Sequence, residues 1–140
     1  MKRHSKYLLI LVLLNLVSCS TSQVCKESKK YVKKIDSSKP YWIEGTYCIS
    51  SVIKYNGIDN KVIIKVFDRV TGNMVEEGTI FFNDLKVTIK SGKVEAVLPD
   101  GIYNIGITTL NSLPFSIKEF VLNDNILVEI NCYLGSSLQF

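Results

Sequence analysis

The chain has 140 residues, with 17 Lys and Arg against 13 Asp and Glu, four Cys and a single His. That residue, His4, lies at the extreme N-terminus, so residues 5–140 contain no imidazole for nucleophilic catalysis, acid–base catalysis or the usual His-containing zinc sites. A pair of catalytic carboxylates is not indicated either, because Glu76 and Glu77 are adjacent and would point to opposite faces of a strand. We therefore expect no catalytic residues and no metal site, and we predict that the protein is not an enzyme.

The first element along the chain is a basic leader followed by an apolar run at residues 7–17, which only Asn15 interrupts. The run is shorter than the roughly 20 residues of a membrane-spanning helix, and this layout is typical of a secretory signal peptide over residues 1–18. The sequence Leu-Val-Ser-Cys at residues 16–19 resembles the lipobox of bacterial lipoproteins. The resemblance implies cleavage before Cys19, a covalent lipid on its sulfur, acylation of the new N-terminus and stable attachment to a membrane. We expect no other cofactor.

Ser20 follows the lipobox and bears on which membrane holds the protein. In Gram-negative lipoproteins an Asp at this position favours the inner membrane, so Ser20 predicts the outer membrane of the cell envelope. The alternative for the N-terminus is a buried apolar helix with an ordinary core Cys. That alternative leaves unexplained why a basic leader, a short apolar run and a small residue before Cys19 coincide at the start of the chain.

Residues 19–40 form the next segment, which has six Lys between residues 26 and 39 against Glu27 and Asp36. Beside a lipid anchor these Lys could attract anionic lipid or other phosphate groups, at about 1 kcal/mol for each Lys near the surface. A solvated, lipid-anchored tether is the simpler interpretation, and we favour it. From residue 40 onward eleven acidic residues outnumber eight basic ones, so we expect no binding of nucleic acid.

Once Cys19 carries lipid, Cys25, Cys48 and Cys132 remain, and an exported protein can form disulfides. We favour a bridge between Cys48 and Cys132, which lie in the first and last predicted strands, because its long loop would contribute about 4–4.5 kcal/mol. A Cys25–Cys48 bridge and buried free thiols are the alternatives.

Residues 41–140 have the pattern of a small all-β domain. Short runs rich in β-branched and aromatic residues alternate with turns of Gly, Asn and Asp; the runs cover residues 46–55, 61–68, 78–82, 86–89, 93–98, 102–108, 115–122 and 126–134. Ile126, Val128 and Ile130 share one strand face, while Glu129 and Asn131 share the other. Each strand thus has one face to bury, which predicts an antiparallel sandwich of about seven or eight strands.

Three segments carry a resemblance to a known family: KVFDRVTGNMVEEGTIFF at 65–82, VEAVLPDGIYNIGI at 94–107 and NDNILVEINCYLG at 123–135. They resemble the carboxypeptidase regulatory-like (transthyretin-like) domain family over about residues 44–134. The resemblance implies a transthyretin/prealbumin-like Greek-key sandwich that acts as an accessory folding or binding module. The chain departs from the family pattern at residues 91–96, where the family often has Thr-Asp-x-x-Gly-x-Phe.

The turn residues in these segments suggest structural roles. Gly72 and Gly101 suit positive φ in tight turns, and Asp68 and Asp100 can accept hydrogen bonds from turn amides. We also expect Tyr103 to bury its ring while its hydroxyl locks the preceding turn.

These features predict a non-catalytic cell-envelope lipoprotein that presents a β-sandwich to another envelope protein through strand edges or end loops. The alternative is a carbohydrate-binding module, which would need two or three exposed aromatic residues on one face. Tyr41 and Trp42, just before the first strand, are candidate binding residues, although we favour their closing the bottom of the core. The tail at residues 136–140 is either an extra edge segment or frayed.

Overall fold

The computed structural model describes residues 24–27, 30–36 and 38–138. The predicted signal peptide, Cys19 and Ser20 lie outside these residues. The strands are β1 (Tyr41–Ile43), β2 (Thr46–Lys54), β3 (Asn60–Asp68), β4 (Glu77–Phe82), β5 (Leu85–Lys90), β6 (Lys93–Leu98), β7 (Gly101–Thr108), β8 (Phe115–Leu122), β9 (Ile126–Leu134) and β10 (Ser136–Leu138). Within the described ranges, no helix is long and apolar enough to cross a bilayer.

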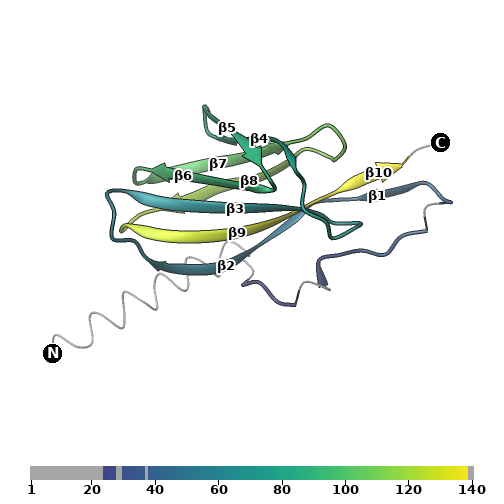
Figure 1. The fold of residues 1–140 in the computed structure, drawn as a ribbon, viewed down its shortest axis with the longest axis horizontal. Helices are drawn as coiled ribbons and strands as arrows, with labels where there is room; N and C mark the ends of the chain where they lie inside the picture. Colours follow the sequence, from purple (N-terminus) through teal and green to yellow (C-terminus); the bar gives the residue numbers. More distant parts are fainter. Residues whose placement is uncertain (1–23, 28–29, 37, 139–140) are drawn as a thin grey trace.

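Eight strands form the predicted all-β sandwich, in the order β2-β9-β3-β6-β5-β4-β7-β8. Strands β5 and β6 share only the pair Lys90–Lys93, so the sheet bends there and its two halves stack as layers (Figure 1). Strands β1 and β10 pair with each other and extend beyond one end of the layers (Figure 1).

The chain connectivity includes a Greek key. Strands β4, β5 and β6 follow one another as antiparallel neighbours. Strand β3, which precedes them in the chain, lies beside β6 at the far side of this group. Strand β9 lies between β2 and β3, antiparallel to the first and parallel to the second. The last long strand therefore completes a layer that the first two long strands begin.

The core lies between the layers and follows from strand alternation. The inward side chains of β3, Val62, Ile64 and Val66, are fully buried. Parallel pairing sets them level with inward residues of β9, including Cys132. The opposite layer contributes residues such as Phe82, and burying each large apolar side chain stabilises the fold by about 1.5–3 kcal/mol.

The turn before β7 confirms the expected role of Tyr103. Its ring is buried and its hydroxyl donates to the carbonyl of Pro99 at 2.7 Å. The expected positive φ at Gly101 is wrong, because Gly101 is already extended as the first residue of β7 and pairs with Leu122. Asp100 accepts a hydrogen bond from the side chain of Asn60.

The turn after β3 matches its prediction. The Asp68 carboxylate accepts hydrogen bonds from the backbone N–H groups of Val70 and Thr71, at 2.7 and 3.0 Å. Gly72 has a φ of 78°, the left-handed conformation that favours glycine. Local residue preferences therefore account for this turn.

Asn60 is a fully buried polar residue that joins three parts of the chain. Its Nδ2 group donates to the carbonyl of Leu98 and to Asp100, and its Oδ1 atom accepts the N–H of Ile126 at 3.0 Å. The side chain therefore holds the start of β9 against the turn before β7.

We expect Asn60→Ala to lower the free energy of unfolding by about 2–3 kcal/mol, because the carbonyl of Leu98 and the part-buried N–H of Ile126 lose the bond to this side chain. Chemical denaturation measures this change. Asn104→Ala is the matched control, because its exposed amide oxygen also accepts a backbone N–H, at 3.1 Å, and should cost under about 1 kcal/mol. Equal losses in the two variants would contradict the role of Asn60.

Candidate functional site

The β2 edge of the sandwich is partly covered by the N-terminal segment. Val24 forms an isolated parallel bridge with Ile49, and the N–H of Cys25 donates to the carbonyl of Ile49 at 2.9 Å. The β2 ladder is also irregular between Ile49 and Ser51. The predicted addition of a partner strand is therefore obstructed at this edge by the chain itself.

The β8 edge is interrupted by a bulge. The pairing of β7 with β8 shifts register next to Asn104, and Glu119 has a φ of 56°. Lys118 and Glu119 are both exposed at this point. Bulges and charged residues on an edge strand oppose pairing with another chain. Neither long edge of the sandwich therefore offers an uninterrupted strand.

The disulfide joins Cys25 to Cys48, and Cys132 is free and buried. The favoured Cys48–Cys132 pairing is wrong for a geometric reason. Cys48 lies opposite Asn131, while Cys132 lies opposite Tyr47, so the two Cys point to opposite faces of the same layer. Cys132 lies in the main core, and Cys48 lies in a second cluster on the outer face.

An aromatic cluster on that outer face anchors the N-terminal segment. The ring of Tyr31 stacks on Tyr133 with centroids 4.8 Å apart, and Phe67 stacks on Tyr133 at 5.2 Å. Tyr31 is only 6% exposed. The expectation of a solvated tether therefore fails for Tyr31 and for the bridged Cys25, both of which contact the sandwich.

Strands β1 and β10 form a short ribbon that projects from one end of the sandwich (Figure 1). The described part of the tail, Ser136–Leu138, is thus an extra strand. At the base of the ribbon a side chain on Gly135 would overlap the carbonyl of Ile43, so glycine allows the two chains to cross closely. In the described part of the protein these two strands pair only with each other.

The ribbon presents Trp42 to solvent. Trp42 is 61% exposed, whereas Tyr41 is half-buried and its hydroxyl lies 3.4 Å from that of Ser136. The favoured interpretation, in which both residues close the core, is wrong for Trp42. Among the described aromatic residues, Trp42 alone is exposed.

The loop between β7 and β8 adjoins the ribbon, because the N–H of Leu113 donates to the carbonyl of Gly135 at 3.0 Å. Leu110 in this loop is 96% exposed. An open groove of about 720 Å³ runs from Leu110 to the loop after β3. We name the ribbon and the loop, residues 41–43, 109–113 and 136–138, the ribbon end. Sequence reasoning missed Leu110, because a single apolar residue in a polar loop gives little signal.

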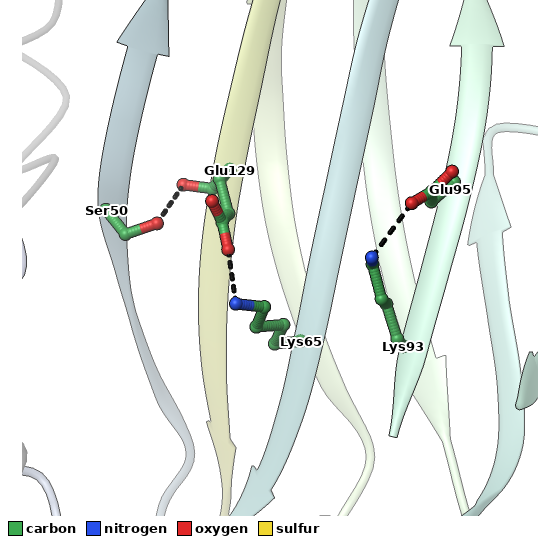
Figure 2. Close-up of polar contacts among 5 residues, drawn as sticks. All are labelled: Ser50, Lys65, Lys93, Glu95 and Glu129. Atoms are coloured by element: carbon green, nitrogen blue, oxygen red, sulfur yellow. Dashed lines mark hydrogen bonds and ion pairs between the residues drawn. The ribbon is translucent and has the colours of Figure 1, made fainter. Parts of the chain in front are cut away.

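The outer face of the β2-β9-β3-β6 layer carries paired charges. Lys65 contacts Glu129 at 2.6 Å and Lys93 contacts Glu95 at 2.9 Å (Figure 2). The hydrogen bond from Lys93, together with the charges of Lys61 and Lys93, lowers the pKa of Glu95. On this face Lys61, Lys65 and Lys93 are therefore paired with Glu95 and Glu129.

The described residues contain no group of three or more His, Cys, Asp or Glu placed to hold a metal ion. The features that remain as candidates are the ribbon end and a basic pocket described below. Comparisons of the chain with protein-family models, curated proteins and solved structures found no match.

Proposed function

We propose that this protein is a non-catalytic lipoprotein of the cell envelope, whose sandwich is an accessory module of the carboxypeptidase regulatory-like type. In this proposal the ribbon end binds another envelope protein. The observation that carries the proposal is the exposure of Trp42 on a projecting ribbon.

The chemistry of the ribbon end suits a protein partner. Trp is enriched among the residues that dominate binding energy, because its large ring is rigid and its N–H can still form a hydrogen bond. Leu110 adds a second exposed apolar side chain on the adjoining loop. The outer backbone edges of β1 and β10 can also accept a partner strand, unlike the obstructed edges of the sandwich.

The proposed location combines two observations. The lipobox sequence supports export and attachment through Cys19, and Ser20 supports the outer membrane. The Cys25–Cys48 bridge supports an oxidising compartment, because disulfides persist outside the cytosol.

A photo-crosslinking amino acid at position 42 tests the proposal in intact cells. We expect a discrete adduct with one envelope protein, and no such adduct from the same group at Ile102, which is equally exposed on β7. Trp42→Ala should weaken recovery of that partner at least tenfold with an unchanged unfolding temperature, because buried Trp contacts often contribute 2 kcal/mol or more. Identical adducts from both positions, or none from position 42, would contradict the proposal.

A carbohydrate-binding module is the second candidate, because the exposed ring of Trp42 could stack on a sugar. The described part of the chain lacks the row of exposed aromatic residues that this function would need, so we rank it lower. Saccharide binding that Trp42→Ala removes, without any protein adduct, would favour this candidate.

A further inference from the structure

A small basic pocket lies where the N-terminal segment crosses the sandwich. Its volume is about 460 Å³, and its lining residues come from three parts of the chain: Lys26, Lys30 and Tyr31, then Thr46 at the start of β2, and Arg69 just after β3. Because β9 separates β2 from β3, the pocket lies across the end of β9. The lining residue Tyr31 is fixed by its stacking on Tyr133.

The charge of this pocket is not balanced. Three of its five described lining residues are cationic and none is acidic. The ion pairs found among the described residues involve Lys61, Lys65 and Lys93. The paired Lys residues lie on the sheet face, whereas no ion pair to Lys26, Lys30 or Arg69 is found among the described residues.

Arg69 is held in position by two backbone carbonyls. Its Nε group donates to the carbonyl of Tyr31 at 3.1 Å, and Nη1 donates to the carbonyl of Glu44. A guanidinium has five N–H donors in a planar fork, so donors remain for an anion. Thr46, which carries a hydroxyl group, is also a lining residue of the pocket.

We propose that this pocket binds a phosphate group. Arginine recognises phosphate with paired hydrogen bonds, lysine adds point charges, and an open polar site suits an anionic headgroup better than an apolar ligand. Only the source of the phosphate rests on the function proposed above. With Cys19 lipidated, the seven-residue separation keeps Lys26 within about 25 Å of the anchor, so phosphates of membrane lipids would be concentrated nearby.

The experiment uses the full lipidated protein in a neutral detergent and follows the NMR signals of Arg69 Nε–H and the Thr46 amide. The probes are inorganic phosphate and dihexanoylphosphatidylglycerol, with zwitterionic dihexanoylphosphatidylcholine for comparison. We expect saturable shifts with an anionic probe. Saturation with inorganic phosphate indicates a free phosphate ligand, and saturation with the glycerol lipid alone indicates a lipid headgroup.

Two double variants with the same charge change separate a pocket from diffuse attraction. Lys26→Gln with Lys30→Gln should weaken binding at least fivefold, whereas Lys33→Gln with Lys34→Gln, exposed in the same segment but outside the pocket, should weaken it less than twofold. Equal losses, no saturable shift, or equal binding of the zwitterionic lipid would overturn the proposal. A Trp42 adduct without phosphate binding would leave the proposed function intact, and the reverse result would leave the pocket intact.

Discussion

Replacing Cys25 and Cys48 by Ser is expected to lower the free energy of unfolding by about 3.4 kcal/mol under oxidising conditions. The bridge spans a sequence separation of 23, and closing a loop of this length in the unfolded chain gives about this value in the chain-entropy model. Because the bridge ties the N-terminal segment to β2, that segment should also open locally more often in the variant. Hydrogen exchange should show the largest acceleration in residues 24–27 and 30–33, and core amides of β3 and β9 should lose protection in step with the fall in the free energy of unfolding.

Reductant supplies the control for this prediction. It should lower the stability of the natural protein to that of the double variant and leave the variant unchanged. Among Cys25, Cys48 and Cys132, peptide mapping without reduction should find only Cys132 labelled. That labelling should require unfolding, because burial raises the pKa of the Cys132 thiol and excludes reagent. A bridge that includes Cys132, or stability insensitive to reductant, would contradict the assignment.

Cys19→Ala is expected to abolish acylation and to release or mislocalise the protein. Each buried methylene of an acyl chain contributes about 0.8 kcal/mol, so losing several chains removes nearly all membrane affinity. Labelling with an alkyne fatty acid, followed by detergent partitioning, measures both effects. Cys132→Ala should keep the label. A Cys19→Ala protein that still partitions with membranes into detergent would show that the lipobox interpretation is wrong.

The strands could be predicted because their signals are local. The observed β8 and β9 have the predicted bounds, 115–122 and 126–134. Within them, alternation of apolar and polar residues marks the buried face, and turn residues mark the ends. The same kind of signal correctly assigned roles to Asp68 and Tyr103, whose partners are at most four residues away.

The candidate sites depend on contacts between distant residues, which such signals do not contain. Whether Cys48 can reach Cys132 depends on the register of β2 against β9, and a shift of one residue reverses the face. The ribbon requires residue 42 to meet residue 137, although neither three-residue strand alternates long enough to be recognised. Two residues of the N-terminal segment signalled that it packs on the sandwich: Tyr31, a lone aromatic residue among Lys residues, and Cys25, for which a bridge to Cys48 was one of the alternatives.

The position of β9 between β2 and β3 determines when the domain can fold. These three strands form a layer only through partners that are some 60 to 80 residues apart, such as Ile64 with Ile130 and Ile49 with Ile130. Such high contact order slows folding, because the cost of loop closure comes before the stabilising contacts. A chain that crosses a membrane from its N-terminus would therefore emerge with β2 and β3 unjoined until residue 134 had followed. In the export proposed above, slow folding would keep the chain competent for translocation and would leave it dependent on protection from aggregation until its last long strand arrives.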